Sequence, residues 1–141
     1  MPDLPDRLPE DYTYASALTA EEVIDLRSKS GWGTEKNTEL WQRVINDSIA
    51  AIGVRDDTSE LVGVGFLAGN PRHVVLCDFI VNPDHRGIGL GRAILNKRVN
   101  LADQLEIPYL YTNLAPTNRL QTYYEELGFV ATGHAYIRAT R

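Results

Sequence analysis

The feature that most constrains the fold is an apolar run followed by a proline turn and then by alternating glycines. Residues 73–81 read HVVLCDFIV, a run too short for most helices and nearly free of polar side chains. Such a run is typical of a central strand that is buried on both faces, here with Asp78 as its one intruding charge. The turn at Asn82, Pro83 and Asp84 ends the predicted strand.

Helical patterns precede and follow this strand. Thr19 and Glu22 fit a capping box, which predicts a first helix over residues 20–28. Apolar spacing predicts a second helix over residues 38–47. The longest predicted helix starts near residue 89, and its polar side chains lie mostly off the apolar stripe: Arg92, Lys97, Arg98, Asn100 and Asp103.

The remaining segments are predicted to form further strands and one further helix. Segments rich in β-formers predict strands at residues 49–54, 61–68, 109–114 and 129–137. Leu120, Tyr123, Tyr124 and Leu127 share one face of a further predicted helix, which Gly128 ends. The resulting order, β-α-α-β-β-β-α-β-α-β, predicts an α/β domain with a mixed sheet.

Composition limits the setting in which this domain works. A chain of 141 residues fits one domain, expected over residues 12–141, after a flexible lead-in at residues 1–11 that is rich in proline and charge. The start lacks the basic and apolar regions of a secretory signal, and no apolar run is long enough for a membrane span. Cys77 is the single cysteine, which excludes an intramolecular disulfide and Cys-rich zinc spacings. We therefore expect a cytoplasmic protein without a metal or a membrane partner.

The formal net charge of -5 argues against nucleic-acid binding, because such proteins usually present a basic face to the phosphates. An acidic surface suits a cationic amine substrate. The alternative is that the acidic charge only keeps the protein soluble, and the net charge does not distinguish these two interpretations.

The glycines after the strand indicate a site. Gly87, Gly89 and Gly91 would each weaken a helix or strand by about 1 kcal/mol relative to alanine, so their clustering predicts a backbone that approaches a ligand closely. At a helix N-terminus that ligand is typically an anion, because free amides and the helix dipole point toward it. A tight turn is the alternative, and the flanking Arg86 and Arg92 favour phosphate.

Other glycine-rich signatures fit less well. A dinucleotide-binding fingerprint requires a third glycine where this chain has Arg92, and the lysine of a P-loop is absent.

The segment VNPDHRGIGLGRAIL resembles the signature of the GNAT (GCN5-related N-acetyltransferase) family, Arg/Gln-x-x-Gly-x-Gly/Ala, which Arg86, Gly89 and Gly91 match. The later YYEELGF is similar to the Tyr-x-x-x-Gly-Phe element of that family. The resemblance implies a mixed, mostly antiparallel central sheet that is splayed at a cofactor cleft and flanked by about four helices. It also implies acetyl-CoA as co-substrate, with contacts from Phe79, Ile80, Val81, Arg86, Gly87, Ile88, Gly89, Leu90, Gly91, Arg92 and Tyr124.

The resemblance also assigns chemical roles. Main-chain groups of residues 79–81 would pair with pantetheine, and an N–H near Phe79 or Ile80 would polarise the thioester carbonyl. Tyr124 would protonate the leaving thiolate, although it could instead only pack on its helix. Thr117 stands where relatives often carry a cofactor-binding asparagine, so Asn118 either contacts the cofactor or caps the helix.

The residues that would bind and deprotonate the acceptor amine are less well defined by the sequence. Asp78 is a candidate base for the amine or a structural carboxylate, and Trp32 either lines the substrate pocket or covers the core. Cys77 is expected to be an inert hydrophobe.

The expected function is an N-acetyltransferase in which a primary amine, on a small molecule or a peptide, attacks acetyl-CoA directly in a ternary complex. The alternatives are a catalytically silent acyl-CoA-binding sensor or scaffold, and a nucleotide or phosphosugar site. The resemblance also allows a homodimer.

Overall fold

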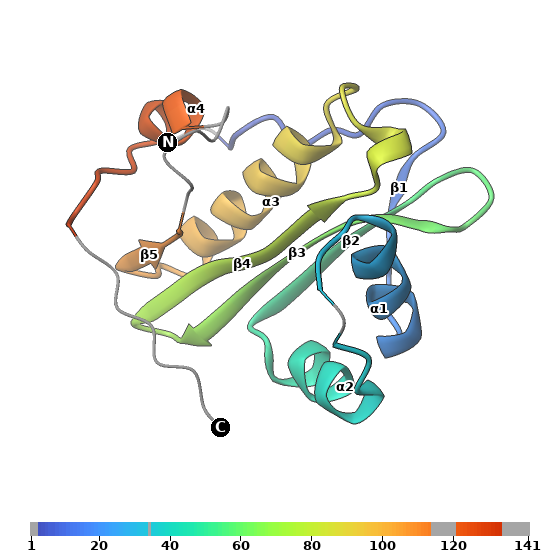
Figure 1. The fold of residues 1–141 in the computed structure, drawn as a ribbon. Coiled ribbons are helices and arrows are strands. Elements are labelled where there is room, and N and C mark those ends of the chain that lie inside the picture. The colour runs from blue at the N-terminus through green and yellow to red at the C-terminus, as the bar shows by residue number, and fades with distance from the viewer. Residues whose placement is uncertain (1–2, 34, 114–120, 134–141) are drawn as a thin grey trace.

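The computed structural model describes residues 3–33, 35–113 and 121–133. In this part of the chain, five strands form one open sheet in the order β1-β2-β3-β4-β5 (Figure 1). Neighbouring strands are antiparallel except β4 and β5, which are parallel. The strands are β1 (Thr13–Tyr14), β2 (Ala50–Arg55), β3 (Leu61–Asn70), β4 (His73–Val81) and β5 (Tyr109–Tyr111).

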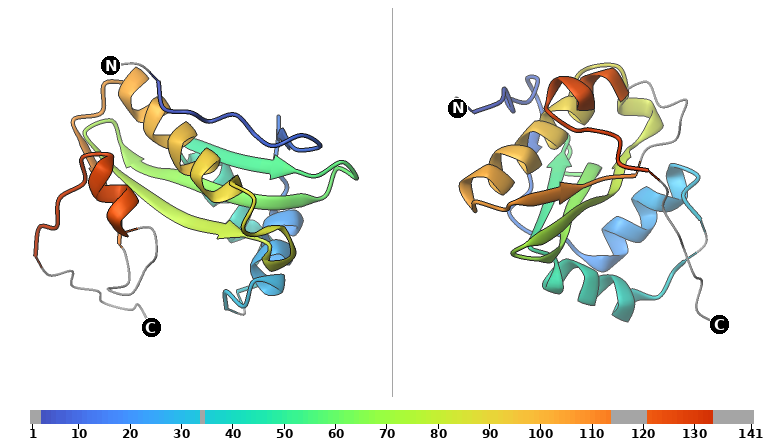
Figure 2. Two further views of the ribbon diagram at one scale, coloured as in Figure 1. Left: turned by 90° about the horizontal axis from the view of Figure 1, so that it is seen from above. Right: turned by 90° about the vertical axis from the view of Figure 1, so that its left-hand side faces the viewer.

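The helices lie on both faces of this sheet, as Figure 2 shows. Helices α1 (Ala20–Lys29) and α2 (Thr38–Asp47) cover one face, and α3 (Leu90–Gln104) covers the other. A short 3-10 helix, η1 (Pro83–His85), leads into α3, and α4 (Gln121–Glu126) packs beside it. This arrangement confirms the predicted α/β fold with a mostly antiparallel sheet.

Local sequence accounts for the helix ends. The Thr19 hydroxyl accepts from the Glu22 amide at 3.2 Å, and the Glu22 carboxylate accepts from the Thr19 amide at 3.1 Å, so the predicted capping box is confirmed. Asn37 caps α2 in the same manner, by accepting from the Leu40 amide at 3.1 Å. Both helices start at the predicted residues.

Strand β4 carries a bulge where the sequence places its single charge. Val64 of β3 pairs with Ile80 and Phe66 pairs with Cys77, so β4 uses one residue more than β3 across the same interval. Asp78 takes up the extra length with a φ of 51°, in the left-handed region that non-glycine residues rarely adopt.

The bulge changes which residues of β4 face each helix layer. Before it, Leu76 packs on the α3 side; after it, Phe79 does, so the alternation slips by one residue. Cys77 and Ile80 pack on the α1 side, where Asp78 also lies because its carboxylate contacts α1. Asp78 and Ile80 therefore lie on the same face of the sheet.

Strands β4 and β5 separate after a short parallel pairing. Their register runs only from His73 opposite Tyr109 to Val75 opposite Tyr111. From residue 76 to residue 81, β4 has no strand partner on this side in the described part of the chain. The sheet is therefore splayed along the half of β4 that leads into the glycine loop.

Some predicted strands differ from the structure. Residues 112 and 113 are not strand, and neither are residues 129–133, where a last strand was predicted to begin; the rest of both predictions lies outside the described residues. Val75 is 37% exposed, so β4 is not buried on both faces along its whole length. Apolar composition overstated this burial, because Val75 does not join the apolar cluster that packs on the α1 side of the sheet.

The segment predicted as a flexible lead-in makes specific contacts along α3. The side chain of Asn100 brackets Leu4, accepting from its amide at 2.7 Å and donating to its carbonyl at 2.9 Å. Asn96 donates to the Pro5 carbonyl at 2.7 Å. These partners are more than 90 positions apart in sequence, so local composition could not reveal them.

Candidate functional site

A hollow of about 320 Å³ opens where the end of β4, the loop before α3 and the loop after α1 meet. Its lining brings together most of the residues that the sequence singled out, together with His85: Trp32, Phe79, Ile80, Val81, His85, Arg86, Gly87, Gly89, Leu90 and Gly91. Ile88, Arg92, Asp78 and Tyr124 are not among the lining residues, and Asn118 lies outside the described part of the chain.

The glycine loop forms an open cradle of main-chain groups. Gly87 and Gly89 have φ angles of 83° and 97°, and a Cβ atom added to either would meet nothing within 4 Å. Gly89 is the N-cap of α3 and offers no side-chain cap, so the first amides of this helix stay free for a ligand. These groups fit an anionic phosphate, with the positive end of the helix dipole behind them.

Gly91 serves a different purpose in the same loop. A Cβ atom at this position would approach the Phe79 ring to 3.3 Å, so glycine lets the first turn of α3 lie close to β4. The phosphate cradle and the edge of the bulged strand are thereby held in one hollow.

The two arginines that flank the loop are held differently. The Arg86 Nε donates to the Val81 carbonyl at 3.0 Å, which ties the loop to the end of β4. The Arg92 guanidinium lies 4.7 Å from the centroid of the Tyr123 ring on α4. Tyr123 also donates to the Asn96 side-chain oxygen at 2.5 Å, so it joins α4 to α3.

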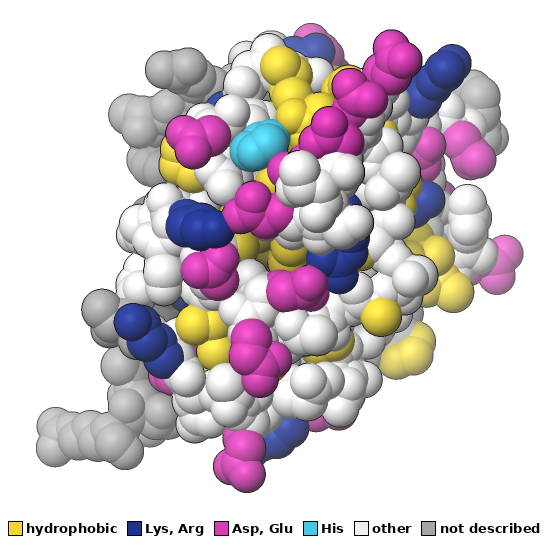
Figure 3. All heavy atoms as spheres, turned by 90° about the vertical axis from the view of Figure 1, so that its right-hand side faces the viewer, with side chains coloured by type: hydrophobic (Ala, Val, Ile, Leu, Met, Phe, Trp, Pro, Cys, Tyr) yellow, Lys and Arg dark blue, Asp and Glu magenta, His cyan; other side chains and the backbone are white. Residues whose placement is uncertain are grey.

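The turn before the loop is braced from the N-terminal segment. The Tyr12 hydroxyl and the His85 Nδ1 are 2.9 Å apart, and their rings meet edge to face. Figure 3 shows acidic side chains gathered over this side of the molecule, next to the turn between β2 and β3. A cationic ligand would find a favourable potential on this face.

Asp78 is engaged by a cation instead of facing the hollow. The Arg27 Nη1 donates to the Asp78 carboxylate at 2.8 Å, and the two side chains are 14% and 28% exposed. The Arg27 guanidinium also lies 4.6 Å from the Trp41 ring and 6.0 Å from the Trp32 ring. These contacts support the structural role for Asp78, whereas Trp32 is 48% exposed at the rim of the hollow.

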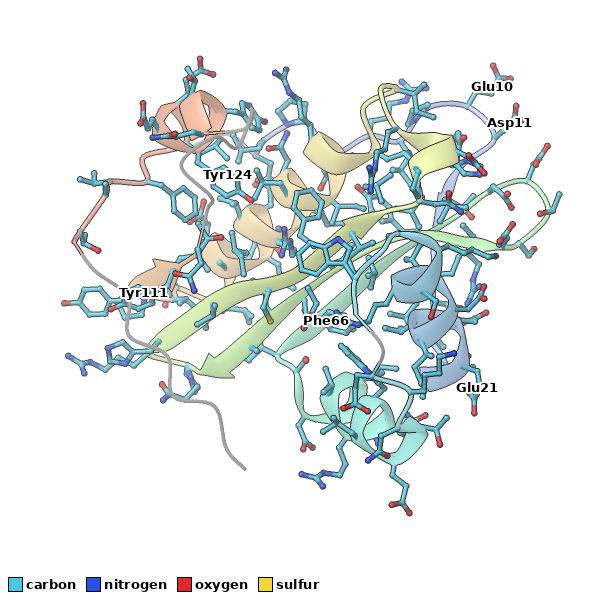
Figure 4. All side chains as sticks on the ribbon, in the orientation of Figure 1. Glu10, Asp11, Glu21, Phe66, Tyr111 and Tyr124 are labelled. Carbon is cyan, nitrogen blue, oxygen red and sulfur yellow. The ribbon has the colours of Figure 1, made fainter. Side chains whose placement is uncertain are left out.

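Tyr124 lies on the α3 side of the sheet (Figure 4) and is only 3% exposed. Its ring packs edge to face on Phe129 at 5.3 Å between centroids. Burial raises the pKa of Tyr124, whereas Arg98 and Thr112 beside its hydroxyl lower that pKa. The phenol is therefore protonated at neutral pH, as a proton donor has to be.

Arg98 is the functional candidate that the sequence pattern missed. It was placed off the apolar stripe of α3, but the structure buries it completely, with an exposed fraction of 0%. Its Nη1 donates to the Phe66 carbonyl at 3.2 Å, and its guanidinium lies 4.8 Å from the Phe79 ring. A Cβ atom on Gly65 would lie 2.8 Å from the Arg98 Nε, so a glycine within an apolar strand was the available signal.

Two further properties concern the described residues alone. No group of three or more of their His, Cys, Asp or Glu side chains is arranged to hold a metal ion. None of their helices combines the length and apolar character of a membrane span.

Comparison with known proteins agrees with this architecture. The family model described as "Acetyltransferase (GNAT) domain" matches residues 12–140. A relative described as an uncharacterised N-acetyltransferase, ycf52 of Pyropia yezoensis, is 26% identical over 112 residues. That alignment spans 77% of this chain and 63% of the relative, so the relative is considerably longer.

Solved structures share the fold at low sequence identity. A ribosomal-protein-alanine N-acetyltransferase from Brucella melitensis biovar Abortus 2308 superposes with a TM-score of 0.71 at 21% identity, over 93% of this chain and 100% of that one. A glucosamine-6-phosphate N-acetyltransferase from Arabidopsis thaliana gives 0.73 at 13% identity, over 94% and 100%. These names give different acceptors to proteins of one fold, so the fold alone does not fix the acceptor.

Proposed function

We propose that this chain, which belongs to the GNAT acetyltransferase family, transfers an acetyl group from acetyl-CoA to a primary amine in a ternary complex. The observation that carries the proposal is a hollow that joins the glycine cradle at the start of α3 to the unpaired edge of β4. The cradle suits the pyrophosphate of the co-substrate, and the strand edge suits its amide-bearing pantetheine arm.

Binding of the co-substrate would rely on the backbone. The amides after Gly87 and Gly89 would hold the pyrophosphate, and Arg86 would add positive charge while it keeps the loop tied to Val81. The main-chain groups of residues 79–81 would pair with the pantetheine, because β5 does not use them.

The same strand edge would assist the transfer. Acetyl-CoA supplies an activated thioester, and a main-chain N–H near Phe79 or Ile80 would stabilise negative charge on its carbonyl oxygen. Tyr124 would then donate its phenolic proton to the departing sulfur, since burial keeps this hydroxyl protonated at neutral pH.

The acceptor amine has to lose a proton before or during attack. Because Asp78 is paired with Arg27, we assign this proton to water in the cleft and keep Asp78 as the alternative that a variant can test. The exposed ring of Trp32 at the rim would contact the acceptor. The acidic face of Figure 3 favours a positively charged amine, small or peptidic.

The test is a screen of amines with acetyl-CoA, in which release of free CoA is followed with a thiol reagent and the products are followed by mass spectrometry. Small amines, amino acids, polyamines and peptides with free N-termini or lysines make up the panel. We expect acetylation of at least one class and none with Gly89→Glu, which blocks the cradle. Acetyl-CoA binding without any turnover would support the silent module, and absence of binding would overturn both.

A further inference from the structure

Arg98 is unusual because its charge is buried without a carboxylate partner in the described part of the chain. No described Asp or Glu forms an ion pair with it, and the ionisable groups that act on its pKa are Tyr124 and Cys77. Its Nε and Nη2 atoms are buried and have no hydrogen-bond partner among the described residues. Burial lowers the pKa of Arg98 to about 10, so the guanidinium still carries its charge at neutral pH.

A buried charge without a paired carboxylate is a poor choice if stability is its only purpose. Unpaired buried donors lose their hydration without replacement, and apolar side chains of similar size commonly fill such positions at no loss of stability. A methionine at this position would follow the same path along the sheet and would leave only the Phe66 carbonyl without its donor. The retained charge therefore points to a use other than packing.

The position of the charge indicates that use. Nη1 binds the carbonyl of Phe66, the residue that pairs with Cys77 at the start of the β4 bulge. The same guanidinium lies over the ring of Phe79, a residue that lines the hollow. The guanidinium also lies close enough to the buried Tyr124 for its charge to lower the pKa of the phenol. One side chain thus connects the bulged strand edge to the proposed proton donor.

We propose that Arg98 is a positioning residue for acetyl transfer: its buried cation holds the hydroxyl of Tyr124 in place beside the bulge of β4 and stabilises the phenolate that forms when Tyr124 gives up its proton. This inference rests on the proposed acetyltransferase function. The inference adds to that function a charged residue that assists the proton donor. Neither the fold nor the glycine loop requires such a residue.

The step that Arg98 assists is a proton transfer coupled to bond exchange. The amine nitrogen forms a bond to the acetyl carbon, and the carbon–sulfur bond breaks with its electron pair on sulfur. The phenolic O–H of Tyr124 breaks, its proton forms an S–H bond, and the phenol oxygen becomes anionic beside Arg98. The proton lost by the amine passes to water, and Tyr124 regains one from solvent, so the reaction yields an amide and free CoA.

Two variants separate this role from packing. In Arg98→Met the volume is kept and the charge is lost, whereas Arg98→Lys keeps a charge. We expect Arg98→Met to lower kcat about ten- to thirtyfold with acetyl-CoA affinity within about twofold of wild type. We expect Arg98→Lys to recover part of that loss. The thermal midpoint of Arg98→Met should be unchanged or higher, since a buried charge is removed. If Arg98 were only structural, Arg98→Met would instead lower the thermal midpoint and leave the kcat of the folded protein unchanged.

A second readout needs no acceptor. With tyrosine labelled with ¹³C at Cζ, the signal that disappears in Tyr124→Phe identifies Tyr124, and its pH titration reports the pKa of this phenol directly. Because Arg98 favours the phenolate, Arg98→Met should raise the Tyr124 pKa above its value in the wild-type protein. Arg98→Lys should lie between the two.

The outcomes are distinguishable. If wild type binds acetyl-CoA and turns over an amine, but Arg98→Met leaves both kcat and the Tyr124 titration unchanged, the inference on Arg98 is overturned and the proposed function stands. If wild type neither binds acetyl-CoA nor acetylates any amine, the proposed function fails, and a Tyr124 titration that still responds to Arg98→Met shows only the electrostatic contact.

Discussion

The glycine loop and the Arg98–Tyr124 pair flank the same strand, β4, but one would act through exposed main-chain groups and the other through buried side chains. The loop is exposed and works through main-chain amides, so its properties follow from residues adjacent in sequence. The pair is buried and works through two side chains from different helices, α3 and α4. The difference implies that co-substrate binding and chemistry can be damaged separately, and the following predictions test this separation.

The largest effect is expected at the loop. Gly89→Glu places bulk and negative charge where the pyrophosphate would lie, and we expect acetyl-CoA affinity to fall at least about a hundredfold, roughly 2.7 kcal/mol. Calorimetric titration measures this change.

Gly89→Ala is the matched control for that variant. It shares the left-handed strain at a φ of 97°, which costs about 1–2 kcal/mol, but adds no charge. Equal losses of affinity in the two variants would mean that backbone strain, not occupation of the cradle, explains the result.

Loss of the proton donor should damage chemistry and spare binding. We expect Tyr124→Phe to lower kcat by about a hundredfold while acetyl-CoA affinity stays within about twofold. The protonated phenol is the active form, so wild-type kcat should fall as pH rises through the raised pKa of Tyr124, and this alkaline fall should be absent in the variant. An alkaline fall that persists in Tyr124→Phe would assign the titration to another group.

Crowding the buried pair should cost stability. In Gly65→Ala the new methyl group would meet the Arg98 Nε at 2.8 Å and the Ile94 side chain at 2.9 Å. We expect a loss of about 1–3 kcal/mol in the free energy of unfolding, measured by urea denaturation. Combination with Arg98→Ala removes the arginine atoms that the new methyl group would meet, so the loss in the double variant should be smaller than the sum of the two single losses. Strictly additive losses would show that Arg98 is not the limiting contact.

The smallest effect is expected at the ion pair between Asp78 and Arg27. Asp78→Asn keeps an acceptor for Arg27 but removes the charge, and partial exposure screens the pair, so we expect a stability loss of about 1 kcal/mol or less. The same variant should keep kcat within about twofold. A drop in kcat of tenfold or more with unchanged acetyl-CoA affinity would instead identify Asp78 as the base for the amine.

The sequence predicted the features that short-range rules determine. The capping box at Thr19, the span of β4 and the glycine cradle all follow from residues close together in the chain. The family resemblance then predicted chemistry along β4 and at Tyr124, and in the described fold those residues lie around one strand.

The features that escaped prediction depend on distant partners. Asn100 and Arg98 look like solvent-facing residues of an amphipathic helix, but the N-terminal segment covers Asn100 and the bulge region of the sheet covers Arg98. Strand propensity at residues 112 and 113 likewise did not decide their structure, because strand formation there requires a partner that β4 no longer provides beyond Val75.

Amide NMR of the ¹⁵N-labelled protein tests most directly whether the amides of the glycine loop bind acetyl-CoA. On titration with acetyl-CoA, we predict the largest shifts at Gly87, Gly89 and Gly91, with smaller ones along residues 79–81 of β4. A titration in which these amides stay unmoved, or in which the shifts gather at a surface away from the hollow, would contradict the account.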